Sequence, residues 1–270
     1  LQGALPTGGW GGAWVGDPDR GFDDRQPGGW VFNILDYAEE PALRAAGAGE
    51  LSGQGKAEQV RRRLAAPLPL FVCSSRRPAA VWPFVVGKLH LTAVPETVSI
   101  APPGEASSEG LPGLARGDYA ACMGSGLPPA HYRSGGSVDR ASVGDLMRDS
   151  DWEVSFGPSP DGVVFRRSRV RLAEITDGLS RTLLVGEKFL DPAAMVAGTS
   201  PDDDQSLYSG HDRDVLRTGC VPPQADRAGY DPATTYGGFP PPIAFGSSHP
   251  AGCGMASCDG AVRTVSYDVD

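Results

Sequence analysis

Glycine and proline occur throughout this chain, and they limit the length of any regular element that it can form. The 270 residues include 37 Gly and 25 Pro. Proline removes a backbone donor and glycine weakens helix and strand interiors, so short strands joined by ordered loops are favoured over long helices. Hydrophobic residues make up 40% of the chain, enough for a folded core. We therefore predict an α+β fold with N-terminal helices packed on a β-rich, mainly antiparallel body.

Hydrophobic periodicity places two helices in the N-terminal third of the chain. Trp30, Ile34 and Tyr37 recur at helical spacing, and Pro41 interrupts or restarts this helix. A second helical pattern covers residues 56–66 and ends before a proline. Both patterns are consistent with helices that pack on a β-rich body.

Three short apolar segments indicate strands before the C-terminal region. The last of them is the strongest candidate for a central strand, because it is almost continuously apolar. No linker, tandem repeat or coiled-coil pattern divides the sequence, so we predict one globular domain over residues 1–270. The three predicted strands cover residues 68–73, 117–122 and 182–187.

The last 26 residues combine a histidine, a turn and a closing strand. His249-Pro250 is followed, after nine intervening residues, by Asp259-Gly260. Asp-Gly favours a turn because glycine supplies a positive φ and aspartate can bond its own backbone. From Ala261 the residues alternate between apolar and polar, which predicts a strand with one buried face. That face would carry Val265, Tyr267 and Val269.

This C-terminal pattern resembles the H-x9-DG signature of prepilin-like proteins that are abundant as paralogues in planctomycetes. That family is catalogued only as a domain of unknown function, number 1559. Further blocks of the sequence are similar to the same family, including one that contains Asp177-Gly178. The resemblance therefore extends over nearly the whole chain. The blocks cover residues 14–21, 26–35, 70–78, 118–120 and 175–188.

The resemblance implies a function as well as a fold. It predicts the globular head of an exported pilin-like or pseudopilin-like subunit, which is not an enzyme and assembles with itself or with partners at the cell surface. Family members usually carry a prepilin leader and an N-terminal apolar helix, and this chain contains neither. The expected location is the cell surface, the periplasm or the extracellular space.

Charge and hydropathy argue against nucleic-acid binding and against a membrane-spanning segment. There are 33 acidic and 24 basic residues, giving a net charge of −9. Nucleic-acid binding requires a concentrated basic patch, which such a chain does not offer. The sequence contains no run of 18 apolar residues, so we expect no membrane span in this form.

The five cysteines show no Cys-x-x-Cys pair, which disfavours a zinc ribbon or a thioredoxin-like motif. Cys253 and Cys258 flank a loop and could close a small disulfide ring in an exported protein. The alternative is that the cysteines are small buried hydrophobic residues.

No recognised catalytic motif occurs in the sequence. A looped hairpin could bring His249 to Asp259, and an aspartate that orients a histidine is a catalytic arrangement. Ser247 and Ser248 would be nucleophiles by residue type alone. We favour instead a bracing role for His249 and a turn-forming role for Asp259, and we predict that the chain is not an enzyme.

An acidic run offers the best candidate for a metal site. Calcium takes several oxygen ligands from carboxylates, carbonyls and water, and a loop dense in aspartate can supply them. No EF-hand spacing is present, and a solvated acidic loop is the alternative interpretation. The candidate ligands are Asp202, Asp203, Asp204, Asp212 and Asp214.

Aromatic residues near the N-terminus suggest an alternative function, an extracellular module that binds a glycan or another solute. Trp10, Trp14 and Trp30 lie in or beside a glycine-rich segment. Exposed, coplanar rings could stack on sugars and would favour binding. Burial of the same rings would favour a structural role.

Overall fold

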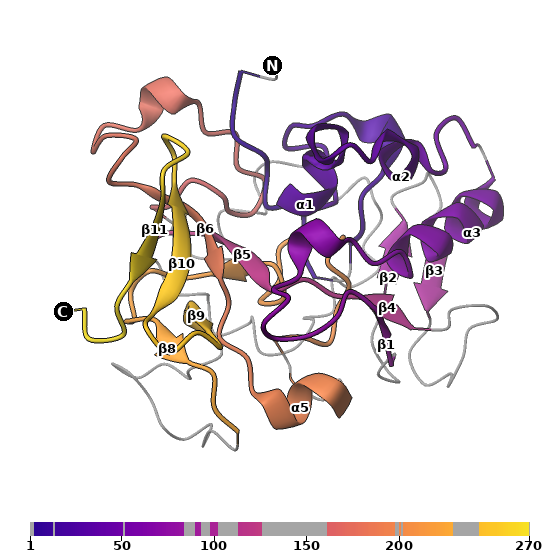
Figure 1. Ribbon diagram of the computed structural model, residues 1–270. Helices are drawn as coiled ribbons and strands as arrows, with labels where there is room; N and C mark the ends of the chain where they lie inside the picture. The colour runs from indigo at the N-terminus through magenta and orange to yellow at the C-terminus, as the bar shows by residue number, and fades with distance from the viewer. Residues whose placement is uncertain are drawn as a thin grey trace.

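In the residues that it describes, the computed structural model contains only short helices, as the glycine and proline content predicts (Figure 1). The longest of the described helices is α3, with 12 residues. No helix in the described part of the chain has both the length and the apolar character needed to cross a bilayer. The helices are η1 (Pro18–Arg20), α1 (Trp30–Asn33), η2 (Leu35–Ala38), α2 (Pro41–Ala45), α3 (Gly53–Leu64), η3 (Pro69–Phe71), η6 (Leu172–Glu174) and α5 (Pro192–Ala197). The structure describes residues 3–12, 14–50, 52–83, 90–92, 98–101, 113–125, 161–197, 200, 202–228 and 243–269.

The main sheet has five strands in the order β11-β10-β6-β5-β7. Its neighbours pair antiparallel, except that β5 and β7 are parallel. The predicted central strand is confirmed, because β6 lies in the middle of the order. The bounds are β5 (Tyr119–Cys122), β6 (Leu183–Glu187), β7 (Leu216–Arg217), β10 (Cys253–Ser257) and β11 (Val262–Val265).

Three two-stranded sheets complete the described β-structure. Only the pair β8–β9 among them is parallel. With the antiparallel main sheet and the N-terminal helices, these pairs make the fold α+β, as predicted. They consist of β1 (Val81–Trp82) with β4 (Leu114–Ala115), β2 (His90–Thr92) with β3 (Val98–Ala101), and β8 (Gln224–Ala225) with β9 (Gly246–Ser247).

The main sheet separates two hydrophobic cores. Because side chains alternate across a strand, β5 directs Ala121 to the larger core while Ala120 and Cys122 reach the smaller one. The larger core includes side chains of α1, η2, α3, β4 and β7, and the smaller one joins β5 to Phe245 and Met255. In Figure 1, α2 and α3 lie on the side away from β10 and β11. β5 and β6 therefore lie between the two cores, with β5 mostly buried and β6 partly buried.

The two predicted N-terminal helices are present, although the first is split. Residues of the first helical pattern form α1 and η2, and Pro41 starts α2 as its first residue. Trp30 is buried, but Tyr37 is 62% exposed and lies outside the expected apolar stripe. The second pattern is α3, whose N-cap Ser52 accepts a hydrogen bond from the amide of Gly55.

The predicted strand at residues 68–73 is wrong. Pro69 begins the short helix η3, which ends at Phe71. Prolines at positions 67 and 69 lack the N–H groups that a strand inside a sheet must supply to its neighbours. The apolar run is buried as a turn of helix, and the chain after η3 carries Cys73.

The predicted final strand is β11, which forms one edge of the main sheet. The turn that precedes it has the expected chemistry, since Gly260 has a φ of +83° and an Asp259 carboxylate oxygen accepts the amide of Ala261 at 3.0 Å. The strand is less buried than predicted. Val265 is partly buried, whereas Val269 is 44% exposed.

Candidate functional site

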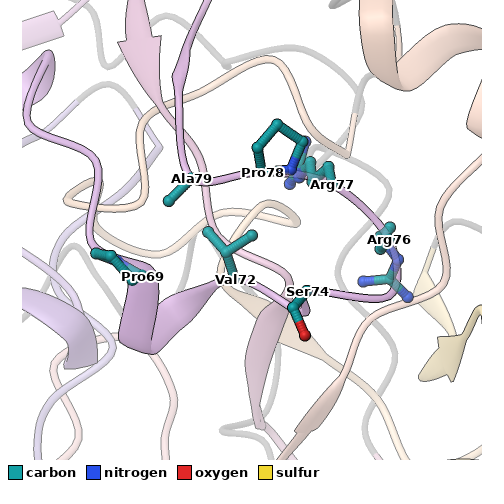
Figure 2. A pocket seen from close by; sticks show the side chains of 7 residues that line it. All are labelled: Pro69, Val72, Ser74, Arg76, Arg77, Pro78 and Ala79. Carbon is teal, nitrogen blue, oxygen red and sulfur yellow. The ribbon is translucent and has the colours of Figure 1, made fainter.

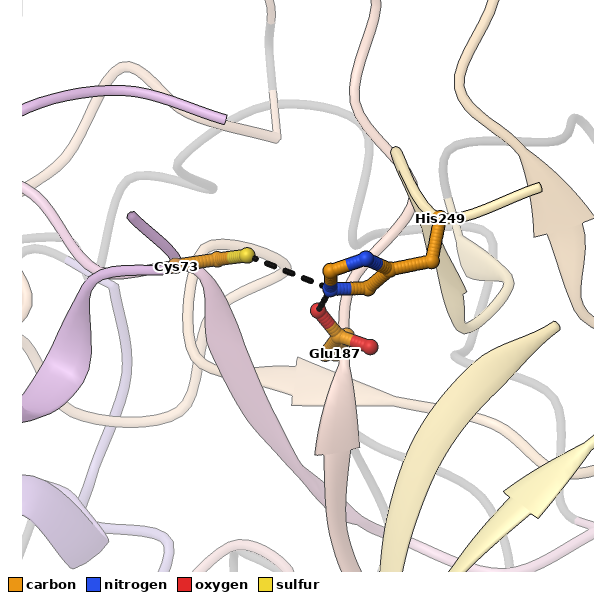
Figure 3. A group of neighbouring side chains, drawn as sticks. All are labelled: Cys73, Glu187 and His249. Carbon is orange, nitrogen blue, oxygen red and sulfur yellow. Dashed lines mark hydrogen bonds and ion pairs between the residues drawn. The ribbon is translucent and has the colours of Figure 1, made fainter. Parts of the chain in front are cut away.

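Three side chains of different chemistry meet near the end of β6 (Figure 3). Cys73 follows η3, Glu187 is the last residue of β6, and His249 lies between β9 and β10. The His249 Nε2 atom lies 3.5 Å from the Cys73 Sγ and 3.3 Å from the Glu187 Oε1. We call these residues the three-donor cluster. Among the described residues, it is the one group of three or more His, Cys, Asp or Glu side chains whose ligand atoms all lie within 4.8 Å of one another.

Two of the three donors are fixed by bonds to other elements. The second carboxylate oxygen of Glu187, Oε2, accepts the amide of Gly254 in β10 at 2.7 Å. The amide of Cys73 donates to the Asp118 Oδ2 at 2.8 Å. These bonds leave the Glu187 Oε1 and the Cys73 Sγ directed at the histidine.

His249 is held through its backbone. Its amide donates to the Ser247 hydroxyl at 3.0 Å, and its carbonyl accepts the Tyr267 hydroxyl at 2.6 Å. The imidazole side chain is 44% exposed, while the Glu187 side chain is 5% exposed and Cys73 is buried. The cluster therefore has a buried side, formed by the sulfur and the carboxylate, and a side open to solvent at the imidazole.

A second polar group begins at the next residues of the same segments. Arg76 and Arg77 follow Cys73, and Lys188 follows Glu187. Six side chains alternate in charge along one run, and each is 4% exposed or less. A seventh buried side chain, Arg116, lies 3.9 Å from the Asp203 carboxylate as a branch of this run. We call this run the ion chain. Its order is Asp226, Arg76, Asp118, Arg77, Asp203 and Lys188.

Arg77 is the centre of the ion chain. Its Nη2 lies 2.7 Å from the Asp118 Oδ1, and its Nη1 lies 2.5 Å from the Asp203 Oδ2. The Lys188 Nζ contacts the other Asp203 oxygen at 2.9 Å. Burial alone would raise the pKa of Asp203, but Lys188 and Arg77 hold that pKa well below its usual value. The carboxylate is therefore charged and paired inside the protein.

Arg76 connects the ion chain to three other parts of the fold. Its Nε lies 2.8 Å from the Asp226 Oδ2, and its Nη1 lies 3.5 Å from the Asp118 Oδ1. Its Nη2 also donates to the carbonyls of Lys188 and Gly246, at 3.0 and 3.3 Å. One guanidinium thus joins β9 and the residues that directly follow β6 and β8 to the loop after η3. This satisfies its donors without any ligand.

Comparison with known proteins identifies the family. A family model described as "Protein of unknown function (DUF1559)", with the label SBP_bac_10, matches residues 3–270. The chain belongs to this family. No curated protein and no solved structure matches it. The predicted membership of this domain family is thereby confirmed, whereas the pilin-like character and the role of the H-x9-DG pattern stay predictions.

In this DUF1559 chain, His249 and Asp259 are not partners. Asp259 lies in the turn after β10, at the opposite end of that strand from His249. The hairpin that could have joined them instead extends the sheet, and the imidazole contacts Cys73 and Glu187. Asp259 forms the turn, as we favoured, with Gly260 beside it.

The other residues of the family pattern lie in turns. Gly178 has a φ of +94°, in the left-handed region that favours glycine. Its carbonyl accepts the amide of Arg181 at 3.0 Å and the hydroxyl of Thr182 at 3.1 Å, which leads the chain into β6. Asp177 and Pro250 are exposed. Neither contributes a side-chain contact to the three-donor cluster.

The three tryptophans are buried and do not form an exposed face. Trp10 and Trp14 are each 1% exposed, and Trp30 is 4% exposed. The rings of Trp10 and Trp14 meet edge-on at an interplanar angle of 71°, so they are not coplanar. The indole N–H of Trp30 donates to the Val215 carbonyl at 2.8 Å. The proposed ligand contacts are therefore core residues.

The acidic run is buried rather than solvated. Asp202, Asp203, Asp204 and Asp214 are at most 5% exposed, and Asp212 is partly buried. Asp203 belongs to the ion chain, and an Asp214 oxygen accepts the amide of Gln205 at 2.7 Å. Cations compensate the charge of Asp203 and an amide binds Asp214, which allows these two carboxylates to face inward. Calcium binding by the five aspartates stays a prediction.

The predicted disulfide between Cys253 and Cys258 is not formed, and all five cysteines are free. Cys253 begins β10 and Cys258 follows its last residue. Five residues of extended strand span about 16 Å, whereas bridged Cα atoms lie less than about 7 Å apart. Burial raises the pKa of Cys253 to about 12 and that of Cys122 to about 11, so both are uncharged core residues.

Sequence reasoning missed the three-donor cluster although it singled out the blocks that supply it. Cys73 and Glu187 lie in segments that carry the family resemblance, and His249 lies in the C-terminal signature. Each block contains at least one side chain able to bind a metal or a proton. The presence of such a side chain in each of these blocks was the signal from which the cluster could have been predicted.

Proposed function

We propose that this DUF1559 chain is a non-enzymatic, exported, pilin-like structural subunit that assembles with itself or with partners at the cell surface. The observation that carries the proposal is the burial of Trp10, Trp14 and Trp30, which are 1%, 1% and 4% exposed. Rings that stack on sugars must be accessible, whereas these rings stabilise the N-terminal loops against the core. Their burial supports a structural role over the glycan-binding alternative.

The edge strand of the main sheet is a candidate surface for assembly. Among the described strands, β11 has a neighbour on one side only, β10, and its first residue, Val262, is 75% exposed. An unpaired strand edge offers backbone donors and acceptors to another chain. An apolar side chain on that edge adds surface that association would bury. We infer that the edge of β11 contacts a neighbouring subunit.

The test is imaging of the purified native protein by electron microscopy, with light scattering at rising protein concentration. We expect ordered filaments or a complex of fixed mass. Val262→Lys should weaken assembly, because a lysine on a strand edge opposes pairing. Val196→Lys is the matched control, since Val196 is also exposed but lies in α5. A strictly monomeric protein at every concentration, or equal loss in both variants, would overturn the proposal.

One observation favours solute binding as a second function. An open hollow of about 440 Å³ lies over the loop after η3 (Figure 2), a volume within the range of small-molecule sites. The family label SBP_bac_10 also hints at binding. A monomer that binds a glycan or another solute, and loses this binding in Val72→Arg, would support this function instead. The lining residues are Pro69, Val72, Ser74, Arg76, Arg77, Pro78 and Ala79.

A further inference from the structure

The three-donor cluster is not arranged as a proton relay. In a relay, the base contacts a nucleophile through one ring nitrogen and a carboxylate through the other. Here the sulfur of Cys73 and the Oε1 of Glu187 both contact the same atom, the Nε2 of His249. A ring nitrogen carries at most one proton, so a single proton would have to serve both partners. Three donors around one point suit a central cation better than a relay.

Two of the separations between the donors match the coordination shell of zinc, and all three ligand atoms lie within 4.8 Å of one another. With Zn–S of about 2.3 Å and Zn–N or Zn–O of about 2.0–2.1 Å, tetrahedral geometry separates S from N by about 3.6 Å and N from O by about 3.3 Å. The measured separations are 3.5 Å for S···N and 3.3 Å for N···O. We propose that Cys73, Glu187 and His249 bind one divalent transition-metal ion of the zinc class. The site is independent of whether the chain assembles.

The types of donor select this class of ion. Thiolate and imidazole are ligands of zinc and related borderline-soft metals, whereas magnesium and calcium take oxygen ligands. A thiolate from Cys73 and a carboxylate from Glu187 together supply two negative charges, which neutralise a divalent ion. The nearest cations along the chain, Arg76 and Lys188, are already paired with aspartates in the ion chain. Because these two cations are already paired, they do not neutralise the Cys73 thiolate and the Glu187 carboxylate, whose charge is available to a metal ion.

Surrounding bonds hold the ligands in place before a metal binds. The Glu187 Oε2 is taken by the Gly254 amide, so Oε1 is the oxygen directed at the site. The Cys73 amide is held by Asp118, which is itself fixed by Arg77. Partners of this kind orient metal ligands and raise affinity. The arrangement is therefore preorganised on β6 and on a loop tied to the ion chain.

The fourth coordination position faces solvent. Cys73 and Glu187 are buried, while the His249 side chain is 44% exposed. Three protein ligands and one open position form the arrangement in which zinc retains a water molecule. We therefore assign the fourth ligand to water.

Metal binding to the full chain tests the site directly. The protein is stripped with a chelator, dialysed and titrated with zinc against a chromophoric chelator, and bound zinc is counted by mass spectrometry. We expect one zinc per chain. Cobalt substitution should give a near-ultraviolet thiolate-to-cobalt charge-transfer band, which reports Cys73 as a ligand.

Three variants and two controls assign the ligands. Cys73→Ser and His249→Ala should each lower zinc affinity by at least about 100-fold, more than the loss of an outer partner costs, and Glu187→Gln by at least about 10-fold. Cys220→Ser, at an exposed cysteine outside the cluster, and Asp259→Ala should leave the affinity unchanged.

The outcomes separate metal binding from a hydrogen-bonded cluster. Wild-type protein that retains less than one zinc per chain at micromolar free metal would overturn the proposal, as would a His249→Ala variant with unchanged affinity. Because replacement of the buried Cys73 can disturb folding, His249→Ala is the decisive variant. Its imidazole is half-exposed, and circular dichroism verifies that the variant is folded. Loss of zinc in this folded variant supports the site.

Discussion

The ion chain and the three-donor cluster both use residues from the loop after η3 and from the end of β6, yet they differ in how completely their groups are paired. Arg77 and Lys188 meet opposite charges at 2.5–2.9 Å, and the ion chain contains three cations and three anions. Four residues before Arg77, the Cys73 sulfur shares one imidazole nitrogen with a carboxylate. Each member of the ion chain contacts an opposite charge inside the protein, and buried Arg116 adds a further cation 3.9 Å from Asp203, whereas the three-donor cluster is open to solvent at its imidazole.

This difference shows how adjacent residues can serve separate purposes. A buried charge is tolerated when each partner is satisfied, so the ion chain can join segments far apart in sequence without a ligand. The three-donor cluster borders solvent and retains the capacity to take up a cation. Alternation along the chain at β6 produces the separation, because Glu187 and the next residue, Lys188, reach different clusters.

The largest expected effect comes from breaking the ion chain. Arg77→Ala should lower the free energy of unfolding by about 3–5 kcal/mol, because Asp203 and Asp118 lose a buried partner. Urea denaturation measures the change. Arg25→Ala is the control, since Arg25 forms a pair with Asp23 at the surface, and it should leave stability nearly unchanged. Equal effects of the two variants would show that the buried ion chain contributes no more to stability than a surface ion pair.

Asp202 gives the next largest effect and shows what an incompletely paired carboxylate costs. Burial raises its pKa to about 6, above the value near 3.8 expected when unfolded. The folded state then binds more protons between these values, so this group adds stability as the pH falls through that window and opposes folding above it. Asp202→Asn should therefore stabilise the protein by about 2–3 kcal/mol near pH 7.

The pH dependence identifies the source of this gain. The difference in free energy of unfolding between Asp202→Asn and wild type should shrink toward zero below about pH 4, where the Asp202 carboxyl is protonated in both the folded and the unfolded protein. Urea denaturation across the pH range measures it. Asp203→Asn provides the opposite sign, because its lowered pKa gives stability that is present above about pH 4 and is lost as the pH falls further. A pH-independent gain in Asp202→Asn would exclude a shifted carboxyl as the cause.

A substitution of His249 tests the three-donor cluster, which is the group open to solvent. Without metal, His249→Ala should cost only about 1 kcal/mol, because the imidazole is 44% exposed and water can replace its contact with Glu187. Thermal unfolding in the presence of a chelator measures this cost. A loss as large as that of Arg77→Ala would mean that the three-donor cluster is a closed brace like the ion chain.

Asp259 gives the smallest expected effect. Asp259→Ala removes the carboxylate that accepts the Ala261 amide in the turn before β11, which should cost about 0.5–1 kcal/mol. Thermal unfolding measures the loss, with Asp259→Asn as the control that retains an acceptor. A larger loss in Asp259→Ala than in His249→Ala would mean that the turn contributes more than the imidazole contact.

Much of the fold could be predicted from local pattern. The period of 3.6 identified α3, the apolar run at 182–187 identified β6, and Asp259-Gly260 identified the final turn. The strand predicted at 68–73 failed because proline positions outweighed the apolar content. The burial of the acidic run could not be predicted, since it depends on Arg77 and Lys188, which are distant in sequence.

The sequence by itself determined the short elements, the turns and the family to which the chain belongs, because these depend on residues that are close along the chain. Only the tertiary structure decided the site. Cys73 and His249 are 176 residues apart, and no local pattern records that they meet at Glu187. Their contact depends on how β6, the loop after η3 and the segment before β10 pack together. Packing of this kind places groups in space without leaving a period or spacing in the sequence.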